Sequence, residues 1–244
     1  MKNIKLTIEY DGTHYHGWQS QDNALTVQDV VTKAINNLTG EDCELIGCSR
    51  TDTGVHALGH VANFVTNSRI PSDRFAYALN AQLPEDVVVK KSEEVSLDFH
   101  SRFQAKGKKY RYLIHNSLYP SALMRHRAYH VLNPLDIELM EKAARQILGT
   151  HDFSAFRASG SDTKTSVRTI TGVWLKKERE LIEFEIEGDG FLYNMVRIIA
   201  GTLVEVGYGR IPADSISDII LSKNRRRAGR TAPAHGLYLV EVYY

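Results

Sequence analysis

The order of secondary-structure signals repeats along the chain, and this repetition restricts the possible folds more than any other feature. Strands are recognised by alternating apolar residues, and helices by apolar residues spaced three or four apart. In the first half the order β-α-β-β-α-β falls on residues 4–10, 27–38, 43–48, 60–66, 72–79 and 87–89. In the second half it falls on residues 110–114, 136–148, 167–177, 181–187, 191–206 and 237–243, with a short helix added at 211–221.

Two such units in tandem predict an α+β protein made of two ferredoxin-like (RRM-like) halves. In each half the sheet is rich in antiparallel pairs, and the helices cover one face. No low-complexity linker separates the halves, and the join falls near residues 100–107. We therefore expect an N-terminal half of residues 1–104 and a C-terminal half of residues 105–244 that share one mixed sheet.

Several helix ends are marked by residues that satisfy or terminate the helical backbone. Thr26 precedes the apolar stripe of the first helix and Gly40 follows it, as expected for an N-cap and a C-cap. Asp136 opens the first helix of the second half, and Gly149 is expected to close it. The stretch 191–206 is apolar almost all round, which predicts a buried helix.

Composition restricts the class of protein. The chain has 244 residues, of which 43% are hydrophobic and 24% charged, and this is ordinary for a globular protein. No apolar run approaches the ~20 residues that cross a bilayer, and the alternating N-terminus lacks the apolar core of a signal peptide. The two cysteines, Cys43 and Cys48, fit no disulfide framework and are expected to be free thiols. We expect a soluble cytoplasmic protein with no membrane partner.

Motifs for metals and nucleotide cofactors are weak in this chain. His56 and His60 have the spacing of two metal ligands on a helix, but no third ligand and no His-Glu-x-x-His pattern accompanies them. The glycines at 188 and 190 do not form a dinucleotide fingerprint, and no Walker motif occurs. We therefore expect no metal and no nucleotide cofactor.

Charge is nearly balanced overall but unevenly distributed. The net charge is +1, yet residues 99–135 and 219–240 contain no acidic residue. The basic residues of these segments are Arg102, Lys106, Lys108, Lys109, Arg111, Arg125 and Arg127 in the first, and Lys223, Arg225, Arg226, Arg227 and Arg230 in the second. Basic runs are usually solvated surface. Two acid-free runs in a nearly neutral chain favour a groove for a polyanion, because phosphate contacts need local charge.

The segment Gly47–Ala57 carries the strongest chemical signal. Asp52 lies between two threonines and two residues before Gly54, a composition suited to a tight turn. Arg50 supplies a nearby cation that would keep the carboxylate ionised. For an isolated Asp-Thr-Gly triplet, a structural turn between strands is a more common explanation than catalysis. The longer motif that surrounds Asp52 is therefore needed to choose between the two.

Four motifs together resemble a tRNA pseudouridine synthase family that acts on positions 38, 39 and 40 of the anticodon stem-loop. They are Arg-Thr-Asp-Thr-Gly-Val-His-Ala at 50–57, Lys-Lys-Tyr-Arg-Tyr at 108–112, Phe-Leu-Tyr-Asn-Met-Val-Arg at 191–197 and Gly-Leu at 236–237. Because the motifs and their flanks span the full length, the resemblance implies the pseudouridine synthase fold for the whole chain.

The resemblance also implies roles for particular residues. Asp52 matches the nucleophile, Arg197 matches the arginine that pairs with it, and Arg50 is a more mobile cation near the flipped nucleotide. Tyr110 matches a substrate-binding tyrosine, and Leu237 matches a leucine that packs against the target base. From the residues alone, Tyr110 could be an ordinary strand tyrosine, and Arg197 could extend its charge to solvent.

The family resemblance implies a homodimer that grips tRNA in basic clefts, with no cofactor because the isomerisation is redox-neutral. The residues expected in the cleft are Lys106, Lys108, Lys109, Arg111, Arg225, Arg226, Arg227 and Arg230. Whether the aspartate attacks the ribose or the uracil stays open.

Two other functions are compatible with parts of the pattern. An aspartic protease also uses Asp-Thr-Gly, but the single triplet would require a symmetric dimer. A non-catalytic RNA-binding module on the same sheet would keep its function after Asp52→Asn.

Overall fold

The computed structural model describes residues 1–160, 163 and 165–244. The chain forms two compact units, which we describe separately. The first unit comprises residues 1–106 together with 238–244, and the second comprises residues 107–237. The last strand of the chain therefore belongs almost entirely to the first unit, whereas the sequence pattern groups it with the second half.

The first unit is built on a sheet with the order β4-β1-β3 and two further strands that pair with β3. These strands are β1 (Lys2–Tyr10), β2 (Ile46–Gly47), β3 (His56–Thr66), β4 (Val87–Val95) and β10 (Leu237–Tyr243). β1 pairs antiparallel with β3 and with β4, and β2 pairs antiparallel with β3. β10 pairs with β3 in parallel, with Tyr238 opposite His56.

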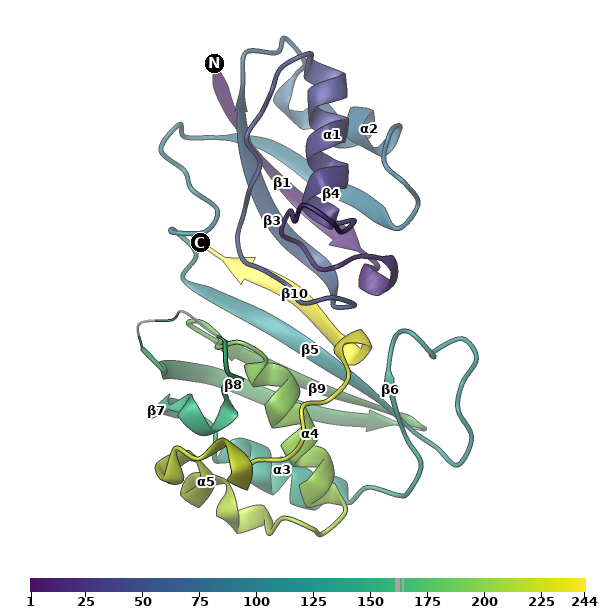
Figure 1. The fold of residues 1–244 in the computed structure, drawn as a ribbon, viewed down its shortest axis with the longest axis vertical. Coiled ribbons are helices and arrows are strands. Elements are labelled where there is room, and N and C mark those ends of the chain that lie inside the picture. Colours follow the sequence, from purple (N-terminus) through teal and green to yellow (C-terminus); the bar gives the residue numbers. More distant parts are fainter. Residues whose placement is uncertain (161–162, 164) are drawn as a thin grey trace. The chain divides into compact units, whose positions relative to one another are not determined.

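Two helices, α1 (Val27–Thr39) and α2 (Phe75–Asn80), contact each other and pack on this sheet (Figure 1). The alternation predicted for residues 4–10 is confirmed, since Ile4, Leu6 and Ile8 are fully buried. Both predicted caps of α1 are also confirmed. Thr26 accepts a hydrogen bond from the Asp29 amide, and Gly40 adopts a left-handed conformation with φ 71°.

The strand predicted over residues 43–48 is wrong in extent, because only Ile46–Gly47 is a strand. Side chains of α1 take the place of a strand partner here. The Cys43 amide donates to Asn36 Oδ1 at 3.0 Å, and the Leu45 carbonyl accepts from Gln28 Nε2 at 2.8 Å. Two of the backbone groups of residues 43–45 are therefore satisfied by helix side chains and not by pairing in the sheet.

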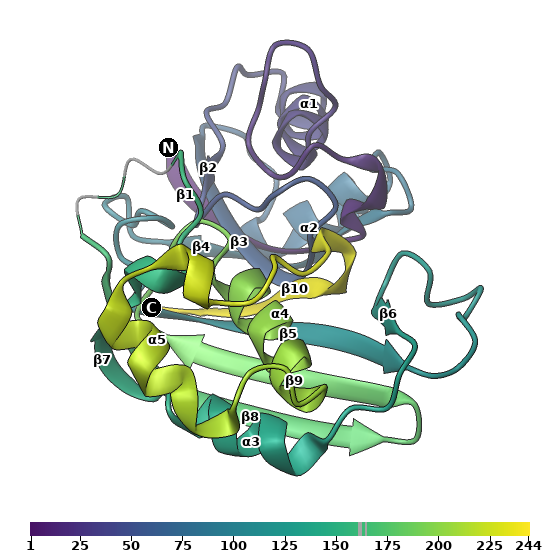
Figure 2. The same ribbon diagram turned by 60° about the horizontal axis from the view of Figure 1, so that its bottom comes forward.

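The second unit contains a sheet with the order β5-β9-β8-β7, in which all neighbours are antiparallel, and β6 pairs in parallel with β5. Its strands are β5 (Gly107–Asn116), β6 (Tyr129–Val131), β7 (Gly149–Asp152), β8 (Val167–Glu178) and β9 (Leu181–Gly188). Its helices are α3 (Ile137–Arg145), α4 (Met195–Gly207) and α5 (Ile216–Ser222). Figure 2 shows α4 lying across this sheet with α3 beside it.

Short 3-10 helices occupy several connections, at Gly12–His14, Ser72–Arg74, Phe153–Phe156, Ala213–Ser215, Arg225–Arg227 and Ala234–Gly236. No helix in the described part of the chain has the length and apolar character that a bilayer crossing requires.

The fourth predicted helix starts later than its apolar pattern suggests. Nearly every residue of α4 is buried, as predicted, but the helix begins at Met195 and not at residue 191. Asn194 adopts a left-handed conformation, with φ 60°, and the Tyr193 carbonyl accepts a bond from the Ala158 amide at 3.1 Å. A turn at residues 193–194 therefore precedes the helix.

The predicted helix 136–148 is also shorter than expected. Asp136 is its N-cap, as predicted, because its side chain accepts from the Leu139 amide. The helix ends at Arg145, and Gly149, with φ 103°, opens strand β7 instead of closing the helix.

Candidate functional site

Asp52 lies in the first unit, in the loop between β2 and β3. The Asp52 carbonyl accepts a hydrogen bond from the Val55 amide at 3.1 Å, and Gly54 adopts a left-handed conformation with φ 77°. The predicted tight turn is therefore confirmed. Asp52 is half-buried, while its neighbour Thr51 is buried and bonds Tyr10 Oη at 2.8 Å. This turn fixes the backbone that carries the half-buried Asp52.

Residues 11–18 pack against this turn and form hydrogen bonds with its backbone. The Trp18 amide donates to the Thr51 carbonyl, and the Gly54 amide donates to the Tyr15 carbonyl, both at 3.3 Å. Gly17 has φ 85°, and a Cβ atom there would lie 2.2 Å from the Thr51 carbonyl oxygen. A glycine is therefore required where the two backbones meet. The sequence analysis did not predict this support. The one feature that could have indicated it is Gly17, a glycine between aromatic residues of the loop.

Aromatic side chains of this supporting loop are packed inside the unit. Tyr15 and Trp18 are buried, and the Tyr15 hydroxyl donates to Asp86 Oδ1 at 2.6 Å. Burial, followed by the hydrogen bond to Asp86, raises the pKa of Tyr15 far above its usual range. Tyr15 therefore stays neutral and anchors the loop near neutral pH.

The two histidines with metal-like spacing lie on β3, not on a helix, and their rings have different neighbours. His56 Nδ1 accepts from the Gly12 amide at 3.0 Å and lies 3.1 Å from Asp11 Oδ1, while its ring stacks on Tyr238. His60 stacks on Trp18 with ring centroids 3.7 Å apart. Within the described residues, no group of three or more His, Cys, Asp and Glu side chains is arranged to hold a metal ion.

Arg197 lies in the second unit, on the first turn of α4, and is half-buried. Its Nε donates to the Ala232 carbonyl at 2.9 Å, and its Nη1 donates to Asn194 Oδ1 at 2.7 Å. The Arg197 carbonyl in turn accepts from the Ala232 amide at 3.1 Å. The guanidinium is therefore oriented by the helix start and by residue 232, unlike a side chain that extends freely into solvent.

Tyr110 and Leu237 are both nearly buried in this unit, with exposed fractions of 8% and 6%. The Tyr110 ring meets Phe191 edge to face, with centroids 5.1 Å apart. Two residues along the strand, the Tyr112 hydroxyl donates to the Pro233 carbonyl at 2.7 Å. Burial raises the pKa of Tyr112 well above its usual value, against the opposing effect of Arg197. Strand β5 therefore holds the segment that leads to Leu237.

Two predicted RNA-binding cations on β5 form ion pairs with carboxylates of β9. Lys109 Nζ lies 2.6 Å from Glu185 Oε2, and Arg111 Nη2 lies 2.8 Å from Glu185 Oε1. Burial alone would raise the pKa of Glu185, but the hydrogen bonds from Lys109 and Arg111 lower it. Residues 99–135 contain no acidic residue themselves. Because β9 pairs with β5, however, carboxylates of β9 lie beside the basic residues of β5.

The second basic run divides into structural and exposed residues. Arg225 is half-buried and donates to the Gly229 carbonyl at 2.8 Å and to Thr231 Oγ1 at 3.1 Å, so it shapes its own loop. Arg230 Nε lies 3.6 Å from Glu205 Oε1. In the same run, Arg226 and Arg227 are exposed. Outside it, Lys106 and Arg50 are exposed and Lys108 is half-buried.

The family model and the curated relatives agree with each other. The family model described as tRNA pseudouridine synthase matches residues 6–104 and 143–244. A protein of Acetivibrio thermocellus named tRNA pseudouridine synthase A is 68% identical over 244 residues, which cover all of both chains. A protein of Ruminiclostridium cellulolyticum with the same name is 56% identical over 245 residues, again over all of both chains. A solved complex of Cbf5, Nop10 and Gar1 matches 97% of this chain and 48% of the other at 10% identity and a TM-score of 0.40.

Proposed function

The chain belongs to the tRNA pseudouridine synthase family, and we propose from this membership how its residues carry out the reaction. It is an isomerase that converts uridine to pseudouridine in tRNA. The N1–C1′ glycosidic bond breaks, the uracil turns, and C5 forms the new bond to C1′ while its proton is lost and N1 gains one. No atom or electron is exchanged with a second substrate. The uridines served are those at positions 38, 39 and 40 of the anticodon stem-loop.

Asp52 is the proposed nucleophile. The observation that carries this assignment is the backbone arrangement around Asp52, in which Gly17, Gly54 and Val55 fix the turn that holds this half-buried residue. A fixed carboxylate needs little reorganisation before it attacks an electrophilic carbon. Attack at ribose C1′ and attack at the uracil ring are both compatible with this arrangement.

Arg197 is the proposed ionic partner of Asp52 in the working enzyme. Its guanidinium is already oriented by Ala232 and Asn194, so pairing would cost little side-chain entropy. A cation next to the carboxylate keeps it ionised and ready to attack. Arg50, exposed and two residues from Asp52, is free to follow the flipped nucleotide.

Tyr110 and Leu237 are proposed to contact the target uracil. The Tyr110 ring can stack on a base, and the Leu237 side chain supplies an apolar wall, as pockets for flipped bases require. Flipping costs a few kcal/mol, which such contacts offset.

The proposed RNA surface consists of Lys106, Lys108, Lys109, Arg111, Arg225, Arg226, Arg227 and Arg230. Exposed side chains such as Lys106 and Arg226 are expected to contribute most. Lys109 and Arg111 would first have to exchange Glu185 for a phosphate. Arg225 would contribute chiefly by shaping its loop.

We further propose that the two β-α-β-β-α-β patterns, 1–104 and 105–244, are ferredoxin-like halves joined through one sheet. The order β4-β1-β3 with β2 beside β3, and the order β5-β9-β8, agree with this proposal. The enzyme is proposed to act in the cytoplasm as a homodimer that holds one tRNA across both subunits.

The test is nucleotide analysis of tRNA from cells that lack this protein, followed by treatment of that tRNA with the purified enzyme. Pseudouridine should be missing from positions 38, 39 and 40 and should be restored by the enzyme. Normal pseudouridine at all three positions, with no formation by the purified enzyme on unmodified transcripts, would refute the proposed function.

A further inference from the structure

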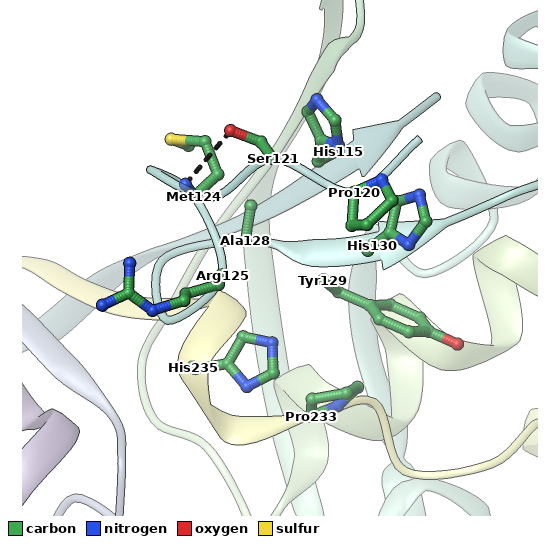
Figure 3. A pocket seen from close by; sticks show the side chains of 10 residues that line it. All are labelled: His115, Pro120, Ser121, Met124, Arg125, Ala128, Tyr129, His130, Pro233 and His235. Carbon is green, nitrogen blue, oxygen red and sulfur yellow. Dashed lines mark hydrogen bonds between the residues drawn. The ribbon is translucent and has the colours of Figure 1, made fainter. Parts of the chain in front are cut away.

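Histidines in both units have no assigned part in the proposed reaction. In the second unit, His115, His130 and His235 line a hollow of about 330 Å³, seen in Figure 3, but its mixed lining selects no particular ligand. In the first unit, His56 is only 2% exposed and follows Asp52 by four residues. Its contacts connect the Asp52 turn to two other segments of this unit.

His56 begins strand β3 and supplies a hydrogen-bond acceptor to the loop after β1. Its Nδ1 lies 3.0 Å from the Gly12 amide nitrogen. Because an amide N–H can only donate, Nδ1 is the acceptor, and the neutral ring carries its proton on Nε2. Gly12 is buried, so an unsatisfied amide there would be costly. The imidazole therefore satisfies a backbone group of a buried residue.

The same loop presses against the residue that precedes His56. A Cβ atom on Gly12 would lie 2.0 Å from the Val55 carbonyl oxygen, so the two backbones are in direct contact. The Val55 amide in turn donates to the Asp52 carbonyl at 3.1 Å. A shift of the loop at Gly12 would therefore be passed to the turn through Val55. The hydrogen bond from Gly12 to His56 opposes that shift.

The ring of His56 also contacts strand β10. It stacks on Tyr238, with ring centroids 4.7 Å apart and an angle of 26° between the planes. The two residues are opposite each other where β3 and β10 pair in parallel. Tyr238 directly follows Leu237 in the sequence. The loop after β1, the end of the Asp52 turn and β10 are thus all joined at His56.

We propose that His56 is a positioning residue for the isomerisation. By accepting from the Gly12 amide, it holds the limb of the turn that leads from Asp52 into β3. It acts on the rate through the place of the Asp52 carboxylate and not through contact with the uridine, because a displaced catalytic group reacts more slowly even when binding is unchanged. The inference rests on the proposed function, since it takes Asp52 as the nucleophile.

Two substitutions separate the acceptor from the ring. His56→Phe keeps a ring that can stack on Tyr238 but removes the acceptor, whereas His56→Asn places an amide oxygen near the Nδ1 position and removes the ring. Single-turnover pseudouridine formation at saturating tRNA and equilibrium tRNA binding are measured for both, with thermal unfolding as the check on folding. We expect His56→Phe to react ~10–100-fold more slowly than wild type, and His56→Asn to react roughly tenfold faster than His56→Phe. Both variants should bind tRNA within about twofold of wild type, because the lost interaction acts on the chemical step.

Phe75→Leu is the matched control for lost stability. Phe75 is fully buried in α2 and packs edge to face on Phe64, so the smaller side chain loosens the core of the same unit at another place. This variant should keep a rate near that of wild type. If it slows the reaction as much as His56→Phe does, lost stability explains the effect and the inference is wrong. His56→Phe with the wild-type rate, or His56→Asn as slow as His56→Phe, would also overturn it.

A spectroscopic measurement on the wild-type enzyme tests the hydrogen bond even if His56→Phe does not fold. In ¹⁵N-labelled enzyme, the His56 Nδ1 signal should be that of an unprotonated acceptor, with a scalar coupling across the hydrogen bond to the Gly12 amide nitrogen. A protonated Nδ1, bonded instead to Asp11 Oδ1 at 3.1 Å, would overturn the inference. A wild-type enzyme that forms no pseudouridine would refute the proposed function, whereas the inference alone fails when wild type is active and His56→Phe is equally fast.

Discussion

Substitution of Gly17 by alanine tests whether the loop behind Asp52 positions the nucleophile. At φ 85° an alanine is strained by ~1–2 kcal/mol. Its Cβ would also lie 2.2 Å from the Thr51 carbonyl oxygen, far inside an ordinary contact distance of ~3.5 Å, so the two backbones must separate by about 1 Å. Overpacking of this kind costs ~1–3 kcal/mol more. We expect Gly17→Ala to lower the free energy of unfolding by ~2–5 kcal/mol in total.

Activity should fall further than stability alone explains, because the residue that moves is the neighbour of Asp52. A displacement of about 1 Å in a catalytic group can reduce the rate ~100-fold. The assay is single-turnover pseudouridine formation at saturating tRNA, under conditions where urea titration shows the variant to be folded. We expect a rate ~10–100-fold below wild type, with tRNA affinity nearly unchanged.

Gly40 provides the matched control. It has a similar φ of 71°, but a Cβ there meets nothing within 4 Å, so Gly40→Ala introduces the strain without the collision. This variant should lose ~1–2 kcal/mol of stability and keep the wild-type rate. If Gly17→Ala and Gly40→Ala lose the same stability and both keep full activity, the supporting loop does not position Asp52.

Three further predictions follow from the charged residues. In a double-mutant cycle with Asp52→Ala and Arg197→Met, thermal unfolding should show a coupling of ~0.5–3 kcal/mol, and purely additive effects would refute the pairing. Because the pKa of Glu185 is lowered on folding, its contribution to stability is present above its usual value near 4.5 and is lost as pH falls below it. Glu185→Gln should therefore reduce the stability difference between pH 7 and pH 3, and an unchanged difference would refute this assignment. Replacing Lys106 and Arg226 by alanine should reduce the slope of log affinity for tRNA against log salt by ~0.7–0.9 per lost phosphate contact, and an unchanged slope would remove them from the RNA surface.

The elements with strong local signals could be predicted from the sequence. The alternation in residues 4–10, the caps Thr26 and Gly40, and the buried character of α4 depend on neighbours close in the chain, and all are confirmed. The turn at Asp52 belongs to the same class, because Gly54 supplies the left-handed conformation it needs.

The features that sequence reasoning missed depend on contacts between distant segments. Periodicity alone cannot show that Asn36 bonds the backbone of Cys43, which is why a full strand was expected there. The pairing of Lys109 and Arg111 with Glu185 cannot be seen in the sequence, because Glu185 is more than 70 residues away along the chain but adjacent across the sheet. The need for glycine at position 17 likewise appears only when the Thr51 backbone is placed against it.

The role of Asp52 as the nucleophile is tested by replacing it with asparagine. Wild type and Asp52→Asn are incubated with an unmodified tRNA transcript, and pseudouridine and tRNA affinity are both quantified, with mass spectrometry of the variant to exclude deamidation to aspartate. If Asp52 is the nucleophile, Asp52→Asn forms no pseudouridine but binds tRNA nearly as wild type does, because the amide keeps the shape of the side chain but not its nucleophilic charge. Multiple turnovers by intact Asp52→Asn would contradict it.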